Sequence, residues 1–254
     1  MIRIKSDDEI ARMKGAGAVV AAVFEAVAPL MKPGISTGEI NRTAHRVIVD
    51  AGATPSFLGY GPAEAPFPAA TCISIDAEVV HGIPSDSRIL EDGMIVSVDV
   101  GACLDGYHGD AARTYIIGDV PPRVKELVEV TEEAFWKGLE QALPGKRLGD
   151  ISSAVQEHCE AHGFGIIRVL TGHGVGAELH ESPNLPNYGR RGRGLRLEAG
   201  MTLALEPMVT LGSFNVAMTA NNWTFETVDG LPASHYENTF VITDDKPVVL
   251  TMRS

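Results

Sequence analysis

The stretch that decides the fold is LEDGMIVSVD at residues 90–99, because an altered copy, LEAGMTLALE, stands at residues 197–206. The two copies share Leu, Glu, Gly and Met at matching places, and each ends an apolar, strand-like run on an acid, Asp99 or Glu206. TYIIGD at 114–119 is echoed by TFVITD at 239–244, and HGIP at 81–84 by HESP at 180–183. We interpret these echoes as an internal duplication with halves of approximately 1–120 and 121–254, packed about a pseudo-two-fold axis. No low-complexity linker separates the halves, so we expect a single domain over residues 1–254.

The pattern between the repeats predicts an α/β chain in which two helices and a set of strands occur twice. Ser6 with Glu9, and Ser36 with Glu39, are capping-box signatures that begin the first two helices, which end near 33–34 and 52. Further helices are expected from 121–122 to about 144–145 and from about 150 to 162. Short β-rich runs predict strands at 72–75, 94–100, 114–117, 202–205, 209–211, 223–227 and 239–243. Residues 54–71 read as an irregular loop, and loops of that length often belong to binding sites.

Composition limits the kind of partner that this chain can have. With 21 basic and 33 acidic residues the formal net charge is −12, which argues against general binding to nucleic acid or to a membrane surface. The apolar run 16–24 is cut off by Glu25 and has acids in its leading flank, so it reads as a core-packing helix and not as a targeting signal. The three cysteines, Cys72, Cys103 and Cys159, have no C-x-x-C spacing and fit a reducing cytoplasm.

Acidic residues stand at matched places in the two halves. Asp110 precedes Thr114 by four residues and Glu237 precedes Thr239 by two, and even offsets on a strand put side chains on one face. If the halves superpose, Asp99, Asp110, Glu206 and Glu237 converge near the axis. Four carboxylates in a small buried space need protons or cations, and one divalent metal or a pair would neutralise them.

The glycine-flanked His173 in TGHGVG adds an imidazole, a common ligand of Zn, Fe, Co and Mn. Glycines there let the backbone bend sharply and approach the site closely. Two adjacent metals act as Lewis acids and make hydroxide available at neutral pH, so hydrolysis is the natural reaction class. The chain has no G-x-S-x-G elbow, P-loop or H-E-x-x-H helix, and Cys72 is expected to be a packed pocket wall.

Taken together, these residues and their neighbours resemble the type I methionine aminopeptidases, and the similarity extends over nearly the whole chain. The matching segments, in order, are VVHGIP at 79–84, SVDVG at 97–101, GDAART at 109–114, GHGVG at 172–176, HESP at 180–183, LEP at 205–207 and YENT at 236–239. The resemblance implies a pita-bread fold, in which two related α/β halves form a central curved antiparallel sheet flanked by helices. It also implies two divalent metal ions per chain, Co, Mn, Fe or Zn, ligated by Asp99, Asp110, His173, Glu206 and Glu237.

The same resemblance implies a role for each residue around the metals. Asp110 and Glu237 would bridge them, and Glu206 would accept a proton from the attacking water. His180 would contact the scissile carbonyl, and His81 would lie near the scissile amide nitrogen. Tyr60, Cys72 and Trp223 would line the substrate pocket.

Glu206 follows His180 by only 26 positions, which leaves no room for the helical insertion of type II enzymes. The expected activity is removal of the initiator methionine from nascent polypeptides that have a small second residue. We expect a cytoplasmic monomer with a transient ribosome contact.

Three positions depart from the family pattern. The 60–68 loop is longer and lacks a histidine, Leu179 stands where a phenylalanine is frequent, and Asp76 replaces a common asparagine. Two alternatives therefore remain open. One is an aminopeptidase of the same fold with a different preference for the first residue, and the other is a non-catalytic pita-bread module that binds peptides or proteins.

Overall fold

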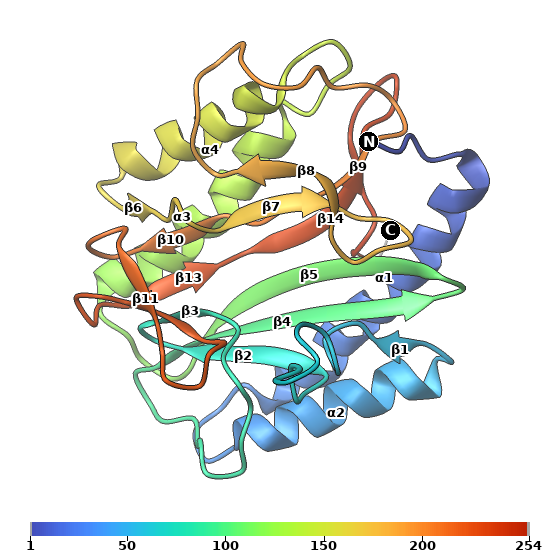
Figure 1. Cartoon of the computed structure of the whole chain (residues 1–254). Helices are drawn as coiled ribbons and strands as arrows, with labels where there is room; N and C mark the ends of the chain where they lie inside the picture. The colour runs from blue at the N-terminus through green and yellow to red at the C-terminus, as the bar shows by residue number, and fades with distance from the viewer. Residues whose placement is uncertain (1, 253–254) are drawn as a thin grey trace.

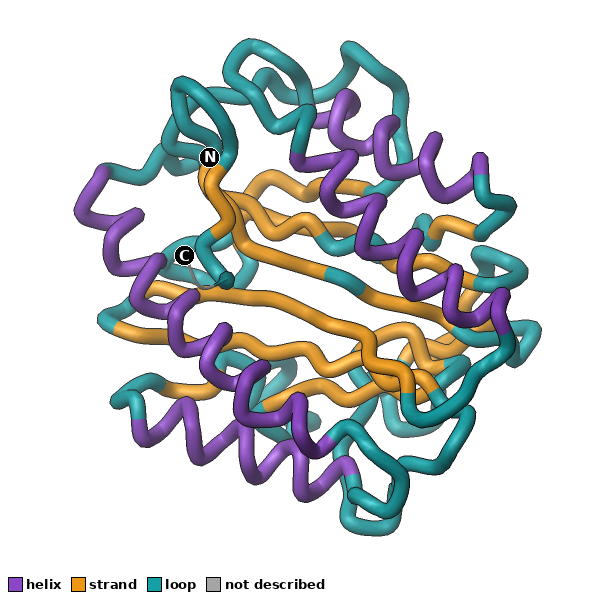
Figure 2. The backbone as a smooth tube through the Cα atoms, turned by 180° about the vertical axis from the view of Figure 1, so that it is seen from behind, coloured by secondary structure: helices purple, strands orange, loops and turns teal. Residues whose placement is uncertain are grey.

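The computed structural model describes residues 2–252, which form four long helices and a set of antiparallel strands (Figure 1). The helices are α1 (Asp7–Val27), α2 (Thr37–Asp50), α3 (Pro122–Leu139) and α4 (Leu148–Ala161), with a short 3-10 helix at Ala28–Leu30. All four cover one face of the central sheet (Figure 2). The opposite face is therefore left for loops and for a site.

The strands are assigned as follows: β1 (Thr54–Pro55), β2 (Thr71–Ile75), β3 (Glu78–Val80), β4 (Ile95–Leu104), β5 (Tyr107–Ile116), β6 (Gly165–Ile166), β7 (Thr171–Gly174), β8 (Glu181–Pro186), β9 (Thr202–Leu205), β10 (Met208–Thr210), β11 (Val216–Met218), β12 (Phe225–Thr227), β13 (Ala233–His235), β14 (Glu237–Val241) and β15 (Val248–Val249). The main sheet has the order β1-β4-β5-β14-β9-β7-β8, with β2 paired to β4 and β15 to β14. Two small sheets, β13-β10-β6 and β11-β12-β3, complete the fold.

The pairing of β5 with β14 joins strands from the first and second parts of the chain. Glu237 lies opposite Ala112 and Asn238 opposite Ala111 in this antiparallel pair. Within the helix-covered face, α1 and α2 bury an apolar cluster against β4. Farther along the same face, α3 and α4 bury a second cluster against β9 and β14. Each helix pair thus covers its own part of the sheet, in the arrangement that the repeated sequence predicts.

The first helix begins as its sequence predicts. The Ser6 side chain accepts a hydrogen bond from the Glu9 backbone, and the Glu9 carboxylate accepts one from the Ser6 backbone. Asp7–Leu30 is the helical segment in the described chain that is long and apolar enough to span a membrane. Half of that apolar stretch is buried in the protein, and α1 packs on α2, β4 and β5.

Every predicted strand overlaps an observed one, but two were predicted much too short and eight short strands were missed: β1, β3, β6, β7, β8, β11, β13 and β15. The predicted strand 114–117 is the end of β5, which begins at Tyr107, and the strand predicted at 94–100 extends to Leu104 as β4. These two strands, of ten residues each, form one hairpin, and its ladder pairs Gly101 with Asp110. The outer half of the hairpin is rich in small and polar residues, which have low strand propensity. Pairing with the neighbouring strand keeps these residues extended, so their sequence does not predict a strand.

Candidate metal centre

Five predicted ligands lie on neighbouring strands of the main sheet. Asp99 lies in β4, Asp110 in β5, Glu237 begins β14, Glu206 directly follows β9 and His173 lies in β7. Because β4, β5, β14, β9 and β7 are consecutive neighbours, strand pairing alone brings these side chains together.

Paired hydrogen bonds hold the backbone at these positions. The Thr239 hydroxyl accepts from the Asp110 N–H at 3.0 Å and donates to the Asp110 carbonyl at 2.9 Å. The Arg113 guanidinium donates to the Glu237 carbonyl at 2.6 Å and to the Asn238 amide oxygen at 2.6 Å. The carboxylates of Asp110 and Glu237 therefore project from a rigid ladder.

His173 is oriented as a nitrogen donor. Its Nδ1 lies 2.9 Å from the Gly174 carbonyl, which can only accept, so Nδ1 carries the proton and Nε2 presents a lone pair. Nε2 lies 3.9 Å from an Asp110 oxygen and 3.7 Å from a Glu206 oxygen. Burial lowers the pKa of His173 to about 3, so the imidazole is neutral.

The expected sharp bend at His173 is absent: residues 171–174 form strand β7, with a register irregularity between His173 and Gly174. Glycine does permit a close approach here, between β7 and the neighbouring strand β9. A Cβ atom on Gly172 would lie 2.4 Å from the Ala204 carbonyl oxygen, so only glycine lets β7 pack this tightly on β9.

The carboxylates in this cluster are short of partners. Asp110 and Glu237 are buried, and one oxygen each of Asp99, Asp110 and Glu237 is buried without a hydrogen-bond donor among the described residues. Burial, followed by the surrounding carboxylates, raises the pKa of Asp99 and Glu237 well above the usual range, and burial raises the pKa of Asp110 to about 7. Such a set of clustered, unpartnered hard oxygen donors with one imidazole fits divalent cations.

Two groups of three side chains each bring ligand atoms within 4.8 Å of one another: Asp110, His173 and Glu237 form one, and Asp99, His235 and Glu237 form the other. Glu237 belongs to both. The two groups therefore overlap at one carboxylate.

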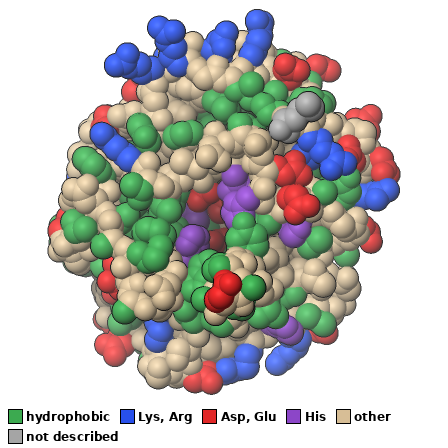
Figure 3. Space-filling model, viewed as in Figure 1, with side chains coloured by type: hydrophobic (Ala, Val, Ile, Leu, Met, Phe, Trp, Pro, Cys, Tyr) green, Lys and Arg blue, Asp and Glu red, His purple; other side chains and the backbone are tan. Residues whose placement is uncertain are grey.

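All ten predicted site residues line one cavity of about 110 Å³, which Phe57 and Phe67 also line. Histidines and acids lie at the bottom of a hollow on the face opposite the helices (Figure 3). The ten are Tyr60, Cys72, His81, Asp99, Asp110, His173, His180, Glu206, Trp223 and Glu237.

Two further histidines flank the ligand cluster. The His180 ring centroid is 4.1 Å from that of His173, and His180 Nδ1 is 2.6 Å from the Tyr60 hydroxyl. His81 has a φ of 60°, a left-handed backbone conformation that is uncommon for a residue with a side chain. Its ring lies 6.2 Å from Trp223, and burial lowers the pKa of His81 to about 4.

The other end of the cavity is apolar. Phe57, Phe67, Cys72 and Leu179 form a buried cluster against which Trp223 packs. The Trp223 indole N–H donates to the Ala65 carbonyl at 3.1 Å, which ties the 54–71 loop to the cavity wall. Burial raises the pKa of Cys72 well above its usual value, so its thiol stays protonated, as expected of a wall residue.

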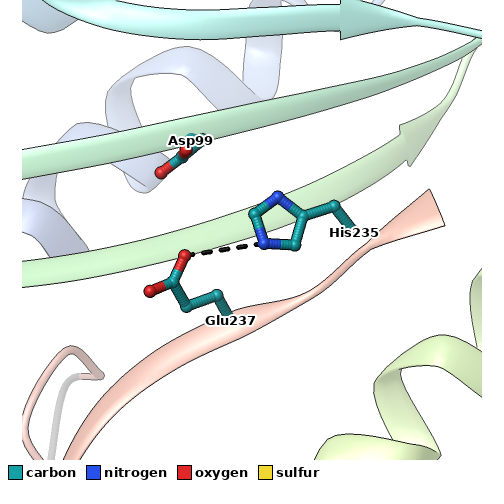
Figure 4. Close-up of side chains that lie close together, drawn as sticks. All are labelled: Asp99, His235 and Glu237. Carbon is teal, nitrogen blue, oxygen red and sulfur yellow. Dashed lines mark ion pairs between the residues drawn. The ribbon is translucent and has the colours of Figure 1, made fainter. Parts of the chain in front are cut away.

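His235, which lies in the second of the two groups, was not among the site residues predicted from the sequence. Its ring points toward Glu237 and Asp99 (Figure 4). The sequence held a signal: His235 precedes Glu237 by two residues, an even offset that puts both side chains on one face of extended chain.

Comparison with known proteins agrees with this geometry. The model of metallopeptidase family M24 matches residues 11–244, and the chain belongs to this family. Methionine aminopeptidase of Clostridium acetobutylicum is 49% identical over 252 residues, covering 99% of both chains. Methionine aminopeptidase 1 of Bacillus subtilis is 47% identical over 251 residues, also covering 99% of both.

Solved structures give the same result. The crystal structure of methionine aminopeptidase from Thermotoga maritima superposes with a TM-score of 0.97 at 45% identity and covers 100% of both chains. Within the family, the chain therefore groups with the type I methionine aminopeptidases, and the predicted pita-bread fold is confirmed. Prolidase from Pyrococcus furiosus has a TM-score of 0.79 at 25% identity, and the match covers 99% of this chain but 66% of the prolidase.

Proposed function

We propose that Asp99, Asp110, His173, Glu206 and Glu237 hold two divalent metal ions, with Asp110 and Glu237 shared between them. The unpartnered buried oxygens of Asp99, Asp110 and Glu237 are the observation that carries this proposal. Bound divalent cations supply Lewis-acid polarisation of a carbonyl and lower the pKa of water, which makes hydroxide available near neutral pH. The remaining chemistry belongs to side chains.

Glu206 is the proton acceptor in this scheme. It is partly open to the cavity, and its two carboxylate oxygens face His173 and His235 at 3.7 and 3.8 Å. Burial and the neighbouring Asp110 raise the pKa of Glu206 well above its usual value, which favours taking up a proton from the attacking water.

His180 stabilises the charge that develops on the scissile carbonyl. If Tyr60 donates its hydroxyl proton to Nδ1, His180 Nε2 keeps its own proton and offers it to the oxyanion. His81 lies near the leaving amide nitrogen, on the wall formed by Trp223 and Phe225, where it orients the substrate or helps to protonate the amine.

The cavity suits an N-terminal methionine. The apolar cluster of Phe57, Phe67, Cys72 and Leu179 accepts a thioether side chain. The chain thus acts as a methionine aminopeptidase that removes the initiator methionine from nascent proteins when the second residue is small. We propose that it does so as a cytoplasmic monomer, in transient contact with the ribosome, and with Co, Mn, Fe or Zn as its metal.

A peptide panel tests this function. Protein purified without chelator, then supplied with Mn²⁺ or Co²⁺, is assayed on peptides that begin with Met, Leu, Ala or Xaa-Pro. We expect cleavage after Met when the second residue is small. Preference for another first residue would mean that Leu179 and the longer loop have changed selectivity, and no turnover on any peptide would indicate a non-catalytic binding module.

Asp110→Ala tests the metal centre in the same assay. It removes a shared ligand, so we expect both metal content and turnover to fall below detection. Asp245→Ala, an exposed acid in the turn before β15, is the matched control and should behave as wild type. Normal turnover in Asp110→Ala would contradict the shared-ligand arrangement.

A further inference from the structure

One imidazole at the metal centre has no part in the function proposed above. His235 ends β13 and is only 2% exposed. Its Nε2 lies 3.6 Å from a Glu237 oxygen and 3.8 Å from a Glu206 oxygen, and it has no hydrogen-bond partner among the described residues. Hydrogen bonds from nitrogen to oxygen span about 2.7–3.2 Å, so neither contact is one.

His235 and His173 stand in equivalent relations to Glu206. His173 Nε2 lies 3.7 Å from one Glu206 oxygen, and His235 Nε2 lies 3.8 Å from the other. Metal–ligand bonds are about 2.0–2.2 Å, so two ligands of one cation lie roughly 3–3.5 Å apart. The observed separations of 3.7 and 3.8 Å are slightly longer than this range. A small inward movement therefore suffices for each imidazole to share a cation with its neighbouring carboxylate.

The internal duplication assigns His235 the place of Asp110. Asp110 precedes Thr114 by four residues, and His235 precedes the matching Thr239 by four. The hydrogen bonds repeat the relation: the Thr239 hydroxyl bonds both N–H and C=O of Asp110, and the Thr114 hydroxyl bonds those of His235, at 3.0 and 2.9 Å. A threonine of each half thus holds the backbone of a residue in the other half: Thr239 holds Asp110, and Thr114 holds His235.

We propose that His235 Nε2 is a sixth protein ligand, which binds one cation together with Asp99 and Glu237 while His173 serves the other. This inference rests on the two-metal centre of the proposed function and adds to it. Each cation then has one imidazole. A nitrogen donor in place of water or oxygen strengthens binding of Co²⁺ and Zn²⁺ more than that of Mn²⁺, following the usual order of divalent affinities.

The surroundings of His235 also fit a ligand role. The groups that face it are the carboxylates of Asp99, Glu206 and Glu237. Its Nε2 is too distant to hydrogen-bond to any of these carboxylates, and a divalent cation between them would give both Nε2 and the unpartnered oxygens a partner.

Metal titration of near-isosteric variants tests the inference. Metal-stripped wild type, His235→Gln, His173→Gln and the exposed control His45→Gln are titrated with Co²⁺ by calorimetry. We expect two binding events in wild type and in His45→Gln. His235→Gln should weaken binding of the cation assigned to His235 by about 10- to 100-fold and leave binding of the other cation unchanged. His173→Gln should weaken binding of the cation assigned to His173.

X-ray absorption of zinc-loaded wild type provides a second readout that does not depend on folding of a variant. Multiple scattering from imidazole should correspond to one histidine per zinc. Half a histidine per zinc, or unchanged affinities in His235→Gln, would overturn the role of His235. Fewer than two cations in wild type, or no effect of His173→Gln, would instead overturn the two-metal centre itself.

Discussion

Replacing Tyr60 with phenylalanine removes one hydroxyl and nothing else from the proposed substrate site. That hydroxyl lies 2.6 Å from His180 Nδ1, and in the proposed mechanism its hydrogen bond keeps the ring proton on Nε2. A hydrogen bond between neutral groups contributes about 0.5–1.5 kcal/mol net. If it acts in the transition state, its loss lowers kcat by about 2- to 10-fold at 25 °C.

The assay separates this effect from a structural one. Steady-state hydrolysis of a Met-Ala peptide should show a lower kcat with little change in KM, because the contact strengthens only as charge develops on the carbonyl. Metal content should equal that of wild type. Tyr188→Phe, at an exposed tyrosine, is the matched control. A Tyr60→Phe enzyme with unchanged kcat, or with the whole loss in KM, would refute the orienting role.

Three other changes test the rest of the structure. Stripping the metals with chelator should lower Tm by about 10–20 °C relative to protein with cation at 100 times Kd, because such binding adds about 2.7 kcal/mol per site and thus about 5.4 kcal/mol for two sites. An equal Tm would show that no cation stabilises the cluster. Leu179→Ala should destabilise the fold by about 2–5 kcal/mol in urea unfolding and relax the preference for Met over larger first residues, and unchanged selectivity would remove Leu179 from the pocket. Hydrogen bonds from Ser6 and Tyr107 lower the pKa of Glu9 to about 2 from 4.5, so its stabilisation is complete above pH 4.5 and is lost as the pH falls toward 2. Glu9→Gln should therefore be less stable than wild type at pH 7 and much closer to it at pH 3, whereas a constant difference would contradict the role of the charge.

Local sequence was sufficient for the elements whose signals are local. Capping residues located the starts of α1 and α2 to the residue, since the cap and its partner are three positions apart on the same turn. The apolar run of residues 202–205 located β9 with its observed bounds. The repeated LE-x-GM segments likewise marked Asp99 and Glu206, although Asp99 lies inside β4 and Glu206 directly follows β9.

The extent of β5 and the part played by His235 could not be derived in that way. Residues Tyr107–Arg113 are extended because they pair along their whole length with β4. Nothing in their own sequence predicts that pairing. The sequence offset puts His235 on the same face as Glu237, but it gives no distance to the other carboxylates. The proposed ligand role rests on the folded structure, which brings Nε2 to within 3.6–3.8 Å of two carboxylates. Periodicity and capping depend on neighbours along the chain, whereas a metal centre depends on distances between strands far apart in it, and folding alone sets those distances.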